Sequence, residues 1–140
     1  MSDLEKGLAA FNTEDYTQAF TLLKPLAEQG NAESQCMIAN MYHLGLGREM
    51  MILEAIKWYI KSAEQGYAVA SNNLAGIYLC GADGVAADRT SAEQWFQKAR
   101  EQGFLHTPIS SDYLKQTLSL RGSQPSPVST EQRKMWYNVK

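Results

Sequence analysis

The stretch AIKWYIKSAEQG at residues 55–66 returns as AEQWFQKAREQG at residues 92–103, which is 37 positions later (55 to 92). An earlier and more divergent copy ends in AEQG at residues 27–30, 36 positions before the same four letters at 63–66 (27 to 63). Internal periods in the mid-thirties are typical of solenoids in which each repeat is a pair of helices. The repeat therefore indicates the fold class before any single motif is considered.

Within each copy, apolar residues recur three or four positions apart, as they do along one face of a helix. The glycine that closes each EQG triplet follows the last helical residue, where a left-handed conformation favours glycine. Thr90, with Glu93 three positions later, predicts a capping box at the start of the last repeated helix. The expected helices are 2–12, 14–29, 32–44, 50–65, 67–80 and 90–102.

Aromatic and glycine positions carry a resemblance to a known family. The pattern YxxGxG at residues 42–47 precedes AxxWYxKxAEQG at 55–66, and YxxGxxGVxxD at 78–88 precedes AxxWFxKA at 92–99. These motifs resemble the consensus of the Sel1-like repeats of the tetratricopeptide-like superfamily. The resemblance implies an all-α fold, a right-handed α/α solenoid of helix pairs. It also implies that the first helix of each pair lines the inner curve.

Three helix-pair repeats are expected over residues 1–104, with approximate limits at 1–30, 31–66 and 67–103. Residues 105–140 form a C-terminal extension with two open interpretations. It is either a degenerate fourth unit that caps the stack or a disordered tail. The pair Trp136-Tyr137 echoes Trp58-Tyr59 and favours the capping unit.

Composition excludes several classes of function. The 140 residues carry a formal charge of −2 without a block of Lys or Arg, which argues against a nucleic-acid partner. No run approaches the ~18 apolar residues of a membrane span, so membrane insertion is not expected. The N-terminal residues lack the apolar core of a secretory signal, which predicts a cytoplasmic protein.

No catalytic motif emerges from the chain. His43 and His106 are isolated and are expected to be solvated, and Cys36 and Cys80 lie too far apart for a disulfide framework or a metal motif. We therefore expect no catalytic residue, no cofactor, no metal and no enzymatic activity. The weaker alternative is a small-molecule binder or hydrolase, because the resemblance extends to cysteine-rich, secreted relatives linked to β-lactam-like ligands. This chain lacks their cysteine pairs.

The function expected is that of an adaptor or scaffold that binds a protein or peptide partner. The first candidate surface is the inner curve, where Met37, Asn40, Asn72 and Asn73 lie opposite or beside the apolar face of their helices. Asparagine amides both donate and accept hydrogen bonds, which suits a peptide backbone. A merely solvated face is the alternative.

The second candidate surface is the outer stripe of helix 50–65. Met50, Leu53 and Ile60 are apolar there, whereas the neighbouring repeats have mostly polar residues at the equivalent positions: Glu14 and Ala87 for Met50, Thr17 and Thr90 for Leu53, and Lys24 and Gln97 for Ile60. A contiguous exposed apolar patch often marks an interface, either for a partner or for a second copy of the chain in a homodimer. The alternative is that loop 44–50 or the C-terminal segment covers the stripe.

Overall fold

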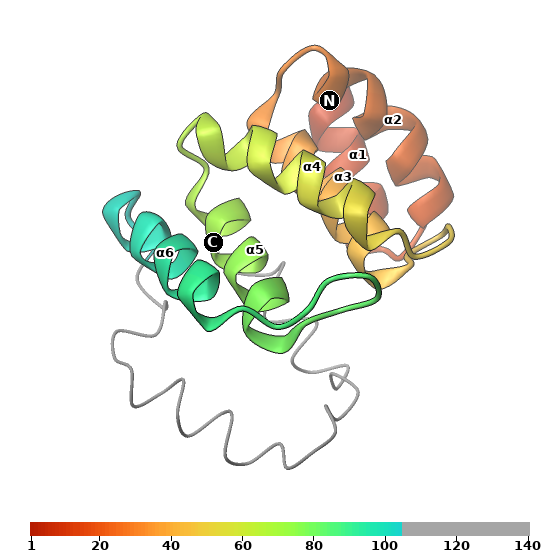
Figure 1. Cartoon of the computed structure of the whole chain (residues 1–140). Helices are drawn as coiled ribbons and strands as arrows, with labels where there is room; N and C mark the ends of the chain where they lie inside the picture. The colour runs from red at the N-terminus through yellow and green to blue at the C-terminus, as the bar shows by residue number, and fades with distance from the viewer. Residues whose placement is uncertain (105–140) are drawn as a thin grey trace.

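The computed structural model describes residues 1–104, and within them six helices form three successive pairs (Figure 1). Each helix packs against the helices that precede and follow it in the chain. The predicted helix limits differ from the observed ones by at most two residues. The extension at 105–140, with the fourth unit and His106, lies outside the described residues. The helices are α1 (Asp3–Asn12), α2 (Tyr16–Glu28), α3 (Ala32–Leu44), α4 (Ile52–Glu64), α5 (Ala68–Cys80) and α6 (Arg89–Glu101).

Most of these helices begin at a side chain that accepts a hydrogen bond from the first turn. Ser2 forms a capping box with Glu5, while Asp15 and Asn31 cap α2 and α3. The capping box predicted at Thr90 and Glu93 is wrong, because α6 begins earlier and Asp88 accepts from the Ser91 N–H at 3.2 Å. No side chain caps α4 or α5, whose N-cap residues are Met51 and Tyr67.

The three EQG triplets end α2, α4 and α6 in the same way. The glycines have φ values of 102°, 93° and 100° at positions 30, 66 and 103. A residue with a side chain is strained in this left-handed region, so glycine allows the backbone to leave the helix at each of these three positions. The sequence prediction for these three helix ends is confirmed.

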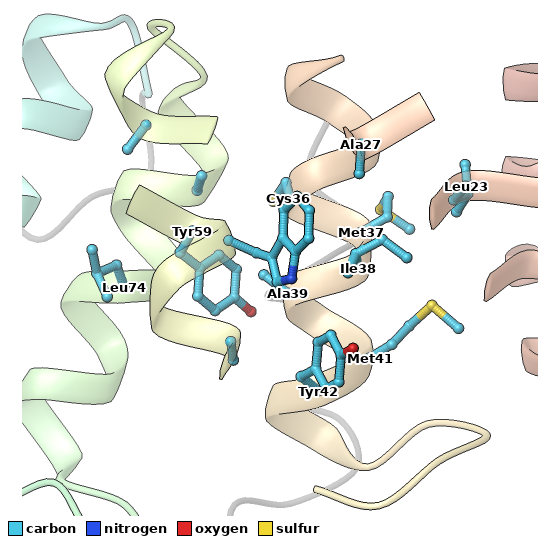
Figure 2. Packing of buried hydrophobic residues seen from close by; sticks show 14 of the residues in the cluster. Leu23, Ala27, Cys36, Met37, Ile38, Ala39, Met41, Tyr42, Tyr59 and Leu74 are labelled. Carbon is cyan, nitrogen blue, oxygen red and sulfur yellow. The ribbon is translucent and has the colours of Figure 1, made fainter. Parts of the chain in front are cut away.

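The core lies both within and between the helix pairs and is lined by small residues. Ala19, Ala39, Ala55 and Ala63 are fully buried, which lets neighbouring helices approach closely. Around them the larger side chains of one cluster interlock from α1 to α5, and Figure 2 shows Leu23 of α2, Ile38 of α3, Tyr59 of α4 and Leu74 of α5 within it. A smaller cluster joins α5 to α6 through Ala75, Leu79, Ala92 and Phe96.

Two loops connect the helices of the second and third pairs, and both return to the preceding helix. The N–H of Met51 donates to the Tyr42 carbonyl at 2.8 Å, and the N–H of Asp88 donates to the Tyr78 carbonyl at the same distance. The first loop also packs on α2, since a Cβ at Gly47 would lie 2.5 Å from the Cβ of Tyr16. The loops therefore hold the start of α4 against α3, and the start of α6 against α5.

Candidate functional site

The inner-curve surface expected at Asn40 and Asn73 is not exposed. Both side chains are 1% exposed, and the Nδ2 of Asn73 donates to the Oδ1 of Asn40 at 3.0 Å. The expectation of a solvent-facing amide pair is wrong because α3 has neighbours on both sides. It packs against α2 and α4, and the Asn73 bond joins it to α5. Every residue from 34 to 43 is buried as a result.

The same two amides belong to a buried polar network that also includes Tyr59 and His43. The Tyr59 hydroxyl donates to the Oδ1 of Asn40 at 2.5 Å, and the Nδ1 of His43 lies 3.3 Å from that hydroxyl. Burial raises the pKa of Tyr59 well above its usual value, so the phenol stays neutral and keeps its proton for Asn40. His43 was expected to be solvated, and that expectation is also wrong.

This network ties three helices of two repeats together. Asn40 and His43 come from α3, Tyr59 from α4 and Asn73 from α5. The Oδ1 of Asn73 has no hydrogen-bond partner, so the network is not fully satisfied. An unpaired buried polar atom is costly, and the surrounding packing must support it. The network is a structural device between repeats rather than a surface for a partner.

The other two inner-curve candidates have different surroundings. Met37 is buried in the core, with its sulfur 3.9 Å from the Nδ2 of Asn40. Asn72 is half-buried and is the one residue of the four that still reaches the surface. The inner-curve prediction therefore fails for Met37, Asn40 and Asn73 as exposed residues, and the binding role of Asn72 stays a prediction.

The buried reactive groups are poorly suited to nucleophilic chemistry. Burial, with a further contribution from the charge of Glu33, raises the pKa of the Cys36 thiol far above its ordinary value. The thiol therefore stays protonated, and a protonated thiol is a weak nucleophile. Within residues 1–104, no three His, Cys, Asp or Glu side chains are grouped so that they could hold a metal ion.

The outer surface at the start of α4 is apolar, as the sequence predicts. Met50 is 48% exposed, Leu53 is 62% exposed, and Met51 between them is 44% exposed. We call these three residues the α4 apolar patch. Ile60 differs from the prediction, because it is half-buried and packs against the main core cluster. Met51 was not among the residues predicted for this surface, although it stands where the next repeat has the polar Asp88.

The family of the chain follows from a comparison with known repeats. The Sel1 repeat model matches residues 4–31, 32–67 and 68–104, so that one match covers each helix pair. The chain belongs to the Sel1 repeat family. Sel1 repeats typically mediate protein–protein interactions and are generally non-catalytic.

Two curated relatives are named as regulators. One is the chitin synthase regulatory factor 3 of Schizosaccharomyces pombe, which is 30% identical in an alignment covering 61% of this chain and 13% of the relative. The other is the exopolysaccharide production negative regulator of Rhizobium meliloti, 28% identical over 94% of this chain and 52% of the relative. The chain thus spans about half or less of the length of these relatives.

Solved structures of Sel1 repeat proteins share the architecture. A protective antigen of uropathogenic Escherichia coli with an SLR fold is 32% identical, with a TM-score of 0.68 over 96% of this chain and 28% of that one. A Sel1 repeat protein from Oxalobacter formigenes is 29% identical, with a TM-score of 0.66 over 96% and 53% of the two chains. The all-α solenoid prediction is confirmed. Among the described helices, none is long and apolar enough to cross a membrane.

Proposed function

We propose that this chain is a non-catalytic adaptor that binds a protein partner through the outer surface at the start of α4. The observation that carries the proposal is the α4 apolar patch. Large apolar side chains stand exposed there on a repeat whose neighbours have Thr17 and Thr90 at the position of Leu53. Family membership supports a protein partner, and methionine side chains adapt readily to different binding surfaces.

The regulatory names of the two relatives support the same proposal, since one protein can regulate another by binding it. Association that buries a large apolar side chain contributes roughly 1.5–3 kcal/mol before ordering costs. The patch has two such side chains that are about half exposed, Met50 and Met51, beside the more exposed Leu53. We therefore expect the patch to be the centre of the contact.

The test uses the full chain as bait, followed by reconstitution of the captured complex from purified components. In the variant Met50→Thr/Leu53→Thr, the second substitution copies Thr17 and Thr90 of the neighbouring repeats, and the first removes the large apolar side chain of Met50. We expect this variant to keep the wild-type melting temperature and to weaken the purified complex at least about tenfold, the effect of losing about 1.4 kcal/mol. Titration calorimetry measures the affinity, and circular dichroism measures the melting.

Ile60→Gln is the matched control on the same helix. Because Ile60 is half-buried against the core, we expect this variant to lower stability without the specific loss of binding. A purified complex that forms equally well with Met50→Thr/Leu53→Thr would contradict the proposed surface. Light scattering on the full chain tests self-association. A stable homodimer that the same double variant dissociates would replace the proposed partner with a second copy.

A further inference from the structure

Aromatic rings and cations alternate in a row that links α2, the end of α3, the loop at 45–51 and α4. The Arg48 guanidinium carbon lies 4.3 Å from the Tyr42 ring centre and 4.1 Å from that of Phe20. The Nζ of Lys24 lies 5.4 Å from the Phe20 ring centre and 5.7 Å from that of Trp58. Lys61 extends the row, with its Nζ 4.6 Å from the Trp58 ring centre. We call these six residues the cation–aromatic row.

The row has hydrogen-bond donors that the described part of the chain leaves unused. The Nε of Arg48 and the Nε1 of Trp58 are buried and have no hydrogen-bond partner. Neither Arg48 nor Lys61 forms an ion pair within residues 1–104, and only Lys24 has one, to Glu28 at 3.6 Å. Trp58 is only 7% exposed, so its unpaired N–H departs from the rule that buried donors are satisfied.

The row lies on the surface between the first and second repeats, which we call the first seam. The corresponding surface between the second and third repeats, the second seam, carries different side chains. Ile56 and Ile60 stand where Phe20 and Lys24 stand, and together with Val85 they pack against the core as half-buried apolar groups. Lys98 over Trp95 is retained, with its Nζ 5.2 Å from the ring centre. Arg48 and Lys24, each in contact with two rings, therefore distinguish the first seam from the second, although both seams share one backbone plan.

We propose that the cation–aromatic row binds an acidic segment of the partner protein, with carboxylates placed on Arg48 and Lys61 and apolar side chains on the adjacent α4 apolar patch. This inference rests on the proposed adaptor function and specifies its partner. Guanidinium and ammonium groups pair with carboxylates, and contact with two rings that meet edge to face, at an interplanar angle of 88°, holds the Arg48 guanidinium in place for such a pairing. Arg48 is two residues from Met50, so charge and apolar contact are neighbours on one loop.

The charges around the row favour a sparse carboxylate pattern over a polyanion. Glu28 and Glu54 lie on the same two helices, and both are paired with lysines that they partly neutralise. The whole chain carries a net charge of −2, which repels nucleic acid in the absence of an extended basic face. One or two carboxylates on an amphipathic segment are enough to pair with Arg48 and Lys61 and are not repelled strongly by Glu28 and Glu54.

The test titrates the full chain with a defined probe, a blocked synthetic peptide of about twelve residues that alternates Asp or Glu with Leu. The indole N–H signals of the ¹⁵N-labelled protein report the site once those of Trp58, Trp95 and Trp136 have been assigned with single Trp→Phe variants. We expect a saturable shift at Trp58 and none at Trp95. Replacing the acids of the peptide by their amides removes the charge and is expected to weaken binding roughly tenfold or more.

The protein variants are Arg48→Gln/Lys61→Gln and the single variant Lys61→Glu, with Lys98→Gln as the matched control in the next repeat. Lys61 is exposed, so its substitution leaves the fold intact and keeps the test valid even if loss of Arg48 lowers stability. We expect the first two to weaken peptide binding about tenfold and the control to leave it unchanged. Thermal melts show whether each variant is folded.

Three outcomes would overturn the proposal: equal binding of the amide peptide, equal loss of affinity in Lys98→Gln, or a much stronger response to a phosphoserine version of the peptide. The purified complex separates this proposal from the adaptor function itself. A partner that binds Arg48→Gln/Lys61→Gln at full strength leaves the adaptor function intact and removes the row as its site. A chain that forms no purified complex at all refutes the adaptor function, whatever the peptide does.

Discussion

The two junctions between repeats are built on the same backbone and filled in opposite ways. At the first junction, between the first and second repeats, the buried position is the apolar Met37 of α3, and the surface carries the cation–aromatic row. At the second junction the equivalent inner position holds Asn73 in a polar network, and the outer seam is lined by Ile56 and Ile60. The first junction is thus apolar in its interior and polar on its surface, whereas the second is polar in its interior and apolar on its surface.

The difference shows that one repeat backbone can hold different side chains at its junctions. Close helix packing at the alanines and the glycine helix ends recur at each junction, so the backbone tolerates either filling. A buried polar network penalises incorrect pairing of helices, because each broken bond leaves a desolvated group unpaired. Of the two unpaired cations in the row, Lys61 is exposed and Arg48 is half-buried, and our proposal places the partner's carboxylates on them. The second junction is suited to holding repeats in register, and the first to binding.

The largest expected effect is at the polar junction. Asn40→Ala removes the acceptor of both the Tyr59 hydroxyl and the Asn73 amide, so the Asn73 amide loses its partner and the Tyr59 hydroxyl keeps only the longer contact to the His43 Nδ1, at 3.3 Å. We expect the free energy of unfolding to fall by about 3 kcal/mol, since each such group costs about 1–3 kcal/mol. Urea unfolding followed by circular dichroism measures it. A loss below about 0.5 kcal/mol would mean that water or repacking replaces the network.

The next largest effect is expected at the N-cap of α4, which differs from the N-cap of α6. Met51 stands where Asp88 caps α6, and no side chain caps α4. Met51→Asp should supply the missing acceptor and raise the free energy of unfolding by about 1 kcal/mol. Met51→Asn is the uncharged counterpart and should give a similar gain, whereas Met51→Ala should give none. Equal stability of all three variants in urea would show that α4 does not use a cap.

The pH dependence of Asp88 is expected to be smaller. Hydrogen bonds from the Ser91 hydroxyl and N–H lower the pKa of Asp88 below its usual value. A lowered folded pKa stabilises the fold above the unfolded pKa, near 3.9, and the contribution is lost as pH falls through the folded value. Wild type should therefore exceed Asp88→Asn in melting temperature at pH 7, with the difference vanishing in acid. A difference independent of pH would contradict this assignment.

The smallest expected effect concerns how neighbouring repeats share a carbonyl. The Nε2 of Gln35 donates to the Ala27 carbonyl at 3.0 Å, whereas in the third repeat Gln102 donates to the Ala63 carbonyl at 2.9 Å. Ser71, at the position of Gln35, is too short to reach that carbonyl and binds Gln102 instead.

Gln35→Ser should therefore let Gln65 take the role of Gln102, with a change in unfolding free energy below about 0.5 kcal/mol. Gln35→Ser/Gln65→Ala removes both donors and should cost about 1 kcal/mol. Equilibrium unfolding of the two variants checks the difference. A full loss in the single variant would show that the two repeats cannot exchange this bond.

The two candidate surfaces differ in how well the sequence predicted them. The exposure of Met50 and Leu53 follows from helical spacing and from the small or polar residues at the matching repeat positions, and the structure confirms it. The same projection placed Asn40 and Asn73 on an open face and failed. Periodicity describes one helix against its average surroundings, whereas α3 has neighbouring helices on both sides.

The sequence by itself determined the helix pairs, their ends at the EQG glycines and the Sel1 repeat architecture, because these depend on local spacing and on backbone conformations that few residues adopt. Only the tertiary structure decided which polar residues are core and which cations lack partners. Asn40 meets Asn73 across 33 positions (40 to 73), and Arg48 meets Phe20 across 28 (20 to 48), neither of which is the repeat period. Contacts between repeats depend on how the pairs stack, and that geometry is not written in the spacing within any one pair.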